Sequence, residues 1–188
     1  MRTRLLIASL AALPLLVVGG YAAAGGQSTV AAAREATSTY HDLERARAAG
    51  YGLELADVSQ ETCIVDLAAQ SAGAMGVHMV NVGLLDDPST AAPLDDTTLE
   101  PTSPEVLVYE RRQNGTLKLV AVEYVVFRAA WEAKHGAGAA PPRLYGVEFD
   151  PNTGARYGLP PFYALHAWIW KPNPTDMFFQ WNPRVTCD

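Results

Sequence analysis

The chain has little cysteine and little positive charge, and it lacks the short motifs of several common enzyme families. Its 188 residues include two cysteines, and 14 basic residues stand against 20 acidic ones. An acidic balance disfavours binding to nucleic acid or to an anionic membrane surface. The sequence contains no G-x-S-x-G, no phosphate-binding loop and no C-x-x-C. It therefore carries no signature of a serine hydrolase with a nucleophile elbow, of a phosphate-loop nucleotide-binding protein or of a dithiol enzyme.

The longest apolar run lies at the N-terminus, where Leu5–Val18 follows Arg2 and Arg4. A membrane-spanning helix needs roughly 20 apolar residues, so this run is too short to be one. Three consecutive alanines follow it and form a small-residue cleavage site. This pattern predicts a signal peptide over residues 1–24 and a single secreted domain over residues 25–188. We therefore expect an extracytoplasmic protein without a membrane anchor after cleavage.

The chain has two cysteines, Cys63 and Cys187, which are far apart in the sequence. Predicted export would place them in an oxidising compartment. In an oxidising compartment such a pair commonly forms a disulfide. The alternatives are two free thiols or a metal-binding pair, but neither cysteine has a cysteine neighbour. We predict a Cys63–Cys187 disulfide. Closing a loop of more than about 100 residues stabilises a fold by about 5 kcal/mol in the chain-entropy model.

The segment Leu117–Phe127 (LKLVAVEYVVF) has the composition of a long central strand, without Gly or Pro. Side chains alternate along a strand, so Glu123 is expected on the row of every second residue from Leu117 to Phe127, which is otherwise apolar. Asn114-Gly115 is a strong hairpin signal just before this segment. We therefore predict that Val106–Glu110 pairs antiparallel with it.

The remaining elements are predicted from periodicity and from the positions of Gly and Pro. Long strands are joined by a hairpin and by loops rather than by regular helices, which indicates an α+β domain with an antiparallel β-sheet and an N-terminal amphipathic helix packed on it. The predicted helices are Thr29–Ala49 and Ala129–Lys134, and the further strands are Cys63–Val65, Ala74–Val82, Leu144–Phe149 and Phe162–Trp170.

The segment Leu84–Glu105 is an acidic loop that contains four prolines. Its carboxylates have the oxygen ligands that calcium prefers. Their spacing matches no EF-hand-like pattern, however, and a solvated loop rich in Pro, Thr and Asp is the favoured interpretation.

Three polar residues lie on otherwise apolar rows of three predicted strands: His78, Glu123 and His166. A lone carboxylate in an apolar row is costly unless it is paired, protonated or bound to a cation. Neutral imidazole and carboxylate both donate lone pairs to divalent metals. If the three faces converge, they form a two-His, one-Glu metal site with coordination positions left open for water, as in catalytic zinc and iron(II) sites.

Other donors bear on the identity of the metal. Glu148, in the predicted strand Leu144–Phe149, is a candidate fourth ligand or base. Met75 and Met79 flank His78, and their sulfurs would favour copper if they reached it. Zinc and iron are the other candidates. The residues specify no reaction, so an enzyme and a non-catalytic metal-binding protein both remain open.

Two alternatives need no metal. In the first, Glu123 and a histidine form an acid–base pair for proton transfer. In the second, the three residues are a buried polar network in a non-enzymatic ligand-binding or structural module. Its pocket would be lined by aromatic residues of the C-terminal quarter. These are Phe162, Tyr163, Trp168, Trp170, Phe178, Phe179 and Trp181.

Four segments carry a resemblance to a known family. They are Gly73–His78 (GAMGVH), Val122–Tyr124 (VEY), Pro160–Trp168 (PPFYALHAW) and Trp181–Cys187 (WNPRVTC). Together they resemble a family of exported bacterial proteins of unknown function, over most of the mature chain. The resemblance implies export, and it assigns no catalytic residue, cofactor or partner.

Overall fold

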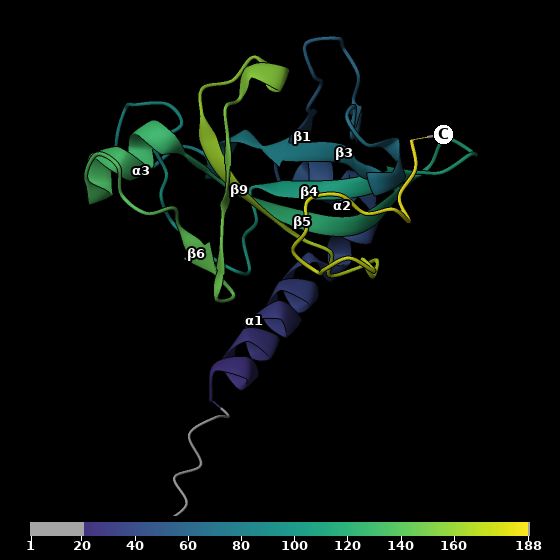
Figure 1. Ribbon diagram of the computed structural model, residues 1–188, viewed down its shortest axis with the longest axis horizontal. Helices are drawn as coiled ribbons and strands as arrows, with labels where there is room; N and C mark the ends of the chain where they lie inside the picture. Colours follow the sequence, from purple (N-terminus) through teal and green to yellow (C-terminus); the bar gives the residue numbers. More distant parts are fainter. Residues whose placement is uncertain (1–20, 188) are drawn as a thin grey trace, which may run out of the picture.

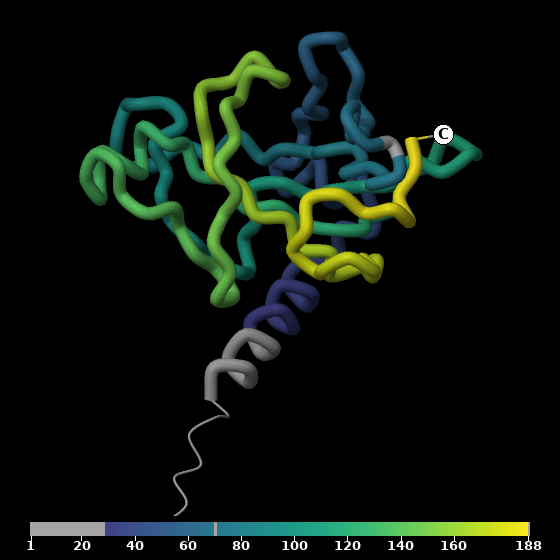
Figure 2. Tube along the Cα trace, in the orientation of Figure 1, coloured from purple at the N-terminus to yellow at the C-terminus, as the bar shows by residue number. Residues whose placement is uncertain are grey.

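The computed structural model describes residues 21–187, and the side chains of residues 21–28 and of Gln70 are not described. Most of the predicted signal peptide, residues 1–24, lies outside this range; its last four residues belong to the first helix. Among the described helices, none combines the length and the apolar character needed to cross a membrane. Figure 2 traces the path of the chain.

An antiparallel sheet of seven strands forms the body of the protein (Figure 1). The strand order is β1-β3-β4-β5-β9-β8, and β2 also pairs with β3, so that β1 and β2 share one edge of that strand. The predicted pairing of β4 with β5 is confirmed. The strands are β1 Tyr51–Glu54, β2 Cys63–Val65, β3 Ala74–Asn81, β4 Val106–Arg111, β5 Leu117–Phe127, β8 Asp150–Asn152 and β9 Phe162–Ala167.

The predicted helix Thr29–Ala49 is interrupted in the structure. Asp42 has extended backbone and accepts a hydrogen bond from the Glu44 N–H, at 3.0 Å, so it is the N-cap of a second helix. An aspartate at this position satisfies a free amide of the first turn. The helices are α1 Tyr21–Thr37, η1 Ser38–His41, α2 Leu43–Ala48, η2 Gln70–Ala72, η3 Val82–Leu84, α3 Arg128–His135 and η4 Ala155–Tyr157.

Different elements pack on the two faces of the sheet. Val30 and Ala33 of α1 and Ala46 of α2 are buried in one hydrophobic cluster with residues of β3, β4 and β5. A second cluster on the other face includes Val108 and Trp168, and loops and the C-terminal segment cover it instead of helices. The predicted α+β class with an N-terminal helix on the sheet is therefore confirmed.

The alternation of side chains along β5 is broken by a bulge. Val108 pairs with Ala121, but the next residue of β4, Tyr109, pairs with Leu119, so Val120 is an extra residue. Leu119 consequently packs in the same cluster as Val122, on the helix-covered face. The prediction that Leu119 shares a face with Glu123 is wrong, since a single row of alternate residues does not extend through a bulge.

Two strand predictions in the C-terminal half need correction. The segment Leu144–Phe149 is not one strand, because Tyr145 and Gly146 have φ values of +56° and +80° and form a tight turn. The turn joins β6 (Arg143–Leu144) and β7 (Val147–Glu148), which pair as a small separate hairpin. β9 ends at Ala167, three residues earlier than predicted.

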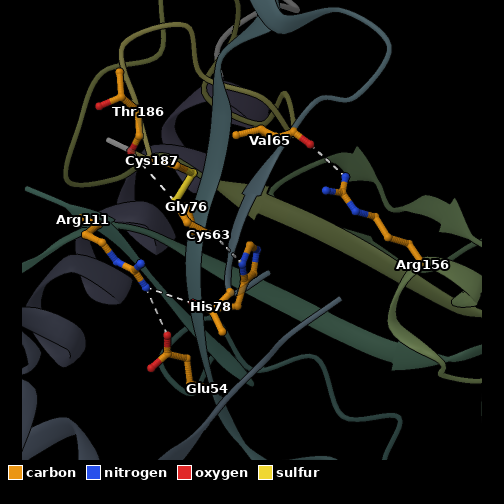
Figure 3. Close-up of a disulfide and its surroundings, with 10 residues drawn as sticks. Glu54, Cys63, Val65, Gly76, His78, Arg111, Arg156, Thr186 and Cys187 are labelled. Carbon is orange, nitrogen blue, oxygen red and sulfur yellow. Dashed lines mark hydrogen bonds and ion pairs between the residues drawn. A yellow bond between two sulfur atoms is a disulfide. The ribbon is translucent and has the colours of Figure 1, made fainter. Parts of the chain in front are cut away.

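The predicted Cys63–Cys187 disulfide is present, with Cα atoms 5.6 Å apart (Figure 3). It fastens the C-terminal segment to β2. An isolated bridge between Ala74 and Asn182 attaches the same segment to the start of β3. The end of the chain is thus fixed to the strands that precede the acidic loop.

Candidate metal site

His78, Glu123 and His166 meet on the face of the sheet opposite the helices. They come from β3, β5 and β9, and Glu123 and His166 are direct partners in the β5–β9 register. All three are buried, with exposed fractions of 3%, 7% and 4%. Each offers a ligand atom within 4.8 Å of the other two. The convergence predicted from the sequence is therefore observed.

The separations between the polar atoms are short and similar. The two Nε2 atoms of His78 and His166 lie 3.3 Å apart. The Glu123 carboxylate lies between the rings, with Oε2 at 3.5 Å from His78 Nε2 and Oε1 at 3.4 Å from His166 Nδ1. Each imidazole thus directs a nitrogen at the carboxylate and at the other ring.

A backbone carbonyl orients the first imidazole. His78 Nδ1 lies 3.2 Å from the carbonyl oxygen of Gly76 (Figure 3). A carbonyl only accepts hydrogen bonds, so Nδ1 carries the proton and Nε2 presents its lone pair to the cluster. Such an outer hydrogen bond is typical of metal-bound histidines, since it fixes both tautomer and ring orientation.

Gly76 holds a position that a side chain would disrupt. Its φ is +107°, and a Cβ at this position would lie 2.5 Å from the carbonyl oxygen of Tyr109. The chain is irregular here, because Ile64 pairs with Gly76 while Val65 pairs with Ala74. The role of Gly76 was not predicted from the sequence, although a glycine inside a strand is a recognised signal of a bulge or a close backbone approach.

Burial favours the neutral form of every member of the cluster. Burial raises the pKa of Glu123 to about 8. It lowers the pKa of His78 to about 4, although the hydrogen bond to Gly76 acts to raise the pKa of this histidine. Burial, and next the neighbouring His78, hold the pKa of His166 well below its usual range. At neutral pH the metal-free cluster therefore has an uncharged carboxyl and two uncharged imidazoles.

These protonation states are compatible with two hydrogen bonds in the cluster. His166 Nε2–H donates to His78 Nε2, and His78 Nδ1–H donates to the Gly76 carbonyl. Glu123 Oε1 lies 3.4 Å from His166 Nδ1, a close polar contact. Within the described part of the chain, no buried side-chain nitrogen or oxygen lacks a hydrogen-bond partner. The neutral cluster is therefore compatible with a metal-free protein.

The same geometry fits a tetrahedral metal. With metal–ligand distances of about 2.0–2.1 Å, neighbouring ligand atoms of a zinc tetrahedron lie about 3.3–3.4 Å apart. The two Nε2 atoms are 3.3 Å apart, and Glu123 Oε2 is 3.5 Å from His78 Nε2. Two imidazoles and one carboxylate are also a common ligand set of catalytic zinc. Two of the ligand-to-ligand distances therefore match such an ion. Binding through His166 Nε2 also requires this ring to carry its proton on Nδ1, beside the Glu123 carboxylate.

The other predicted donors lie in different places. Glu148 is on the small β6–β7 hairpin, half-exposed, and pairs with Arg143 at 3.1 Å, so the prediction of a fourth ligand is not supported. Met79 is buried in the helix-side cluster, on the face away from His78. Met75 does line the cavity beside the three residues. A copper site that uses both methionines is therefore ruled out.

The acidic loop uses its carboxylates to hold its own backbone. Asp86 Oδ1 accepts from the Leu94 N–H at 2.6 Å, and Asp95 Oδ1 accepts from the Asp87 N–H at 2.7 Å. Among the described residues, the only group of acidic, His or Cys side chains placed to share a metal is the His–Glu–His cluster. The loop is thus a structured connection and presents no calcium cluster.

A cavity of about 200 Å³ opens directly above the cluster. Sequence reasoning expected a pocket lined by C-terminal aromatic residues, but of that group only Phe162 lines this cavity. Trp168 is buried in the second hydrophobic cluster, and Trp170 packs against the first. The walls are mainly aliphatic. Two of their residues, Leu85 and Leu94, come from the acidic loop, which the sequence predicts to be solvated.

A second buried carboxyl, Glu105, was not recognised in the sequence. Its exposed fraction is 4%, and its Oε2 accepts from the Val125 N–H at 3.0 Å, at the place where β4 begins. Burial raises the pKa of Glu105 to about 8. The sequence signal for its burial is its position directly before the apolar strand Val106–Arg111.

Comparison with known proteins adds no assignment. No family model matches the chain, and neither the curated proteins nor the solved structures contain a significant match to it. The function has to be argued from the chemistry of the cluster and of the cavity above it.

Proposed function

We propose that this is an extracytoplasmic zinc-binding protein whose ion is held by His78, Glu123 and His166. The observation that carries the proposal is the placement of three buried donors within 4.8 Å of one another, with the Gly76 carbonyl fixing the tautomer of His78. A fourth position faces the cavity and is open to water or a ligand, as in sites that bind a substrate at the metal. Export is supported by the N-terminal signal pattern and by the Cys63–Cys187 disulfide.

The free energies favour the metal over the metal-free network. At pH 7, removing the proton from a carboxyl with a pKa of about 8 costs about 1.4 kcal/mol. Structural zinc sites in small peptides bind with apparent free energies of about 10–16 kcal/mol. A site with fewer protein ligands and an open position binds more weakly, but the cost of deprotonating Glu123 is small by comparison.

The ligand set also favours zinc over the other metals. Both methionine sulfurs would be needed for a copper site of the kind considered from the sequence, and Met79 faces away. Iron(II) with two histidines and one carboxylate requires further open positions, and only the cavity side of the cluster is free. The 3.3 Å separation of the two Nε2 atoms is close to the edge of a zinc tetrahedron and supports this choice.

A metal-free ligand-binding protein is the second candidate. The hydrogen bonds from His166 to His78 and from His78 to the Gly76 carbonyl favour it, because they hold the neutral imidazoles in place without an ion. In that case Glu123 would be the proton-carrying group at the floor of the cavity. The two candidates differ in whether the protein takes up an ion.

Zinc content after purification without an affinity tag tests the proposal. The mature chain is expected to retain about one zinc ion per molecule after dialysis against metal-free buffer. His78→Ala and Glu123→Gln are expected to lose it. Binding of Co(II) gives a second reading, because the intensity of its visible absorption distinguishes four-coordinate from six-coordinate sites.

Glu105→Gln is the matched control for Glu123→Gln. Both residues are buried glutamates with a pKa raised to about 8, but Glu105 bonds to the Val125 amide and not to the histidines. The control is expected to retain zinc. Zinc retained by both ligand variants, or no zinc taken up by the folded wild-type protein, would contradict the proposal and leave the metal-free network.

A further inference from the structure

The cavity above the cluster is bounded by elements that are distant in sequence. Its floor is formed by His78, Glu123 and His166, and its walls come from β1, β3, β5, β8, β9 and the acidic loop. Two exposed hydrophobic residues, Leu53 and Val82, belong to its lining, with exposed fractions of 50% and 42%. The opening is therefore apolar at its rim, and a molecule can enter from solvent.

The walls are mostly aliphatic, which sets the character of what fits. Leu55, Val80, Leu85, Leu94, Val125 and Phe162 are among the lining residues. An apolar wall gains free energy when it is covered by an apolar surface, by about 25 cal/mol for each Å² removed from water. Pockets of this composition, with a few convergent polar groups at one end, are typical of small-molecule sites.

Without a metal ion, the charges of the lining disfavour anionic ligands. Glu123 and Asp150 are its only acidic residues, and among the described residues that line it there is no Lys or Arg. An anion that entered the metal-free cavity would lose its hydration without meeting a counter-ion. Asn152 and Gln180 are the other polar side chains of the lining apart from Tyr157 and the cluster itself, and both are neutral.

The volume limits the size of the ligand. An engineered apolar cavity of about 150 Å³ in another protein holds benzene. On the same scale, a cavity of about 200 Å³ holds a molecule of about eight non-hydrogen atoms. This size corresponds to a single substituted ring or a short branched chain.

From these observations we infer that the cavity binds a small, predominantly apolar molecule, uncharged when it binds the metal-free protein, whose one lone-pair donor faces His78, Glu123 and His166. The apolar part of this inference stands on the walls alone. The direction of the donor rests on the proposed zinc site, because the open coordination position faces the cavity.

Three probes separate these contributions: toluene, 4-methylpyridine and benzoate, titrated at pH 8 into the metal-free and the zinc-loaded mature protein. Toluene and 4-methylpyridine have nearly the same shape, and only the second has a ring nitrogen that can bind a metal. Toluene is expected to bind both forms with similar affinity. 4-Methylpyridine is expected to bind the zinc-loaded form at least about tenfold more tightly than the metal-free form.

Benzoate tests the charge argument in the metal-free protein, where it is expected to bind at least about tenfold more weakly than toluene. Ala164→Leu tests the location, because Ala164 lines the cavity and a larger side chain there fills it. This variant is expected to lose toluene binding while it retains zinc. Ala137→Leu, at an exposed position after α3, is the control that should bind toluene normally.

The outcomes distinguish the two proposals. Failure of toluene to bind either form of the folded protein, or equal binding of benzoate and toluene to the metal-free form, would overturn the inference and leave the zinc result unaffected. Toluene binding by a protein that takes up no zinc would support the apolar pocket and overturn the zinc site. Toluene binding that persists in Ala164→Leu would place the probe elsewhere and refute the inference.

Discussion

Glu123 and His166 are register partners on the adjacent strands β5 and β9, and their side chains meet with Oε1 3.4 Å from Nδ1. The backbone ladder therefore sets the distance between carboxylate and imidazole, and no loop has to order for them to meet. His78 completes the cluster from β3, which is separated from β5 by β4. Because the three donors lie on paired strands of one sheet, the site is preorganised, which reduces the entropy lost when an ion binds.

Zinc affinity should depend on pH through Glu123. An ion binds the carboxylate, but the metal-free protein holds Glu123 protonated below its pKa of about 8, while His78, with a pKa of about 4, is already neutral. Affinity is thus expected to rise about tenfold per pH unit between about pH 5 and pH 8, and to level off above that. Near pH 7, about one proton should be released per zinc bound.

Calorimetric titration in two buffers of different ionisation enthalpy measures this proton. The Glu123→Gln variant has no carboxyl to titrate, so any residual binding should lose the slope. If affinity in the wild-type protein is constant between pH 6 and pH 8, Glu123 is already ionised in the metal-free protein, and the neutral cluster described above is wrong.

Gly76→Ala should damage both the fold and the site. The added Cβ has to occupy a left-handed backbone position and would approach the Tyr109 carbonyl to 2.5 Å. We expect a loss of roughly 2–4 kcal/mol in the free energy of unfolding. Zinc affinity should fall about 10- to 100-fold, because the carbonyl that orients His78 would shift.

Gly115→Ala is the control for this substitution. Gly115 also has a positive φ, +79°, but a Cβ there meets nothing within 4 Å. The Gly115→Ala substitution should lower the free energy of unfolding by about 1 kcal/mol and leave zinc affinity unchanged. Denaturant unfolding and zinc titration of both variants test this prediction. Equal losses of stability would show that the contact with Tyr109 is not important.

Glu105→Gln should stabilise the protein at alkaline pH. The pKa of Glu105 is raised from 4.5 to about 8 in the folded state, so between these values the folded protein binds a proton that the unfolded chain does not. The contribution of Glu105 to the free energy of unfolding is fully present below pH 4.5 and is lost as the pH rises through 8. Glutamine keeps an acceptor for the Val125 N–H but does not ionise.

The variant and the wild-type protein should therefore be similarly stable near pH 4. At pH 9 the variant should be more stable, by on the order of a few kcal/mol. Unfolding curves at the two pH values measure this difference, and because Glu123 titrates in both proteins its contribution cancels. A difference that does not change with pH would mean that Glu105 is ionised at little cost.

Loss of the disulfide should lower stability more than it affects zinc. Replacing both Cys63 and Cys187 by alanine removes a link between residues 124 positions apart, and we expect a loss of about 2–5 kcal/mol. His78, Glu123 and His166 are held by the β3–β4–β5–β9 ladder, so zinc affinity should change less than tenfold, on the order of 1 kcal/mol. Unfolding curves with and without reductant provide the same comparison in the wild-type chain.

Much of the central sheet could be predicted because its signals are local. Asn114-Gly115 determines the β4–β5 hairpin, and the apolar row around Glu123 marks the inner part of β5. The candidate cluster was recognisable for a related reason. A polar residue within an apolar strand needs a partner, and three such residues in one sheet are expected to meet.

The errors arise where the chain departs from regular periodicity. The bulge at Val120 has no residue signal, since its extra residue is as apolar as its neighbours, and only the pairing with β4 reveals it. The turn at Tyr145 requires a left-handed tyrosine, a conformation that composition does not predict. The cavity walls were also missed, because which loop leucines turn inward depends on tertiary packing.

The two short strands β1 and β2 on the outer edge of β3 affect how the protein can self-associate at high concentration. β1 and β2 occupy that flank in two short pieces, and the opposite flank is β8, three residues long with Pro151 in its middle, which has no amide hydrogen to donate. In the part of the chain that the structure describes, neither flank of the main sheet presents a long, straight run of unpaired amides. Fibrillar self-association by strand addition is thereby discouraged, even though the interior strands are among the most β-prone segments of the sequence.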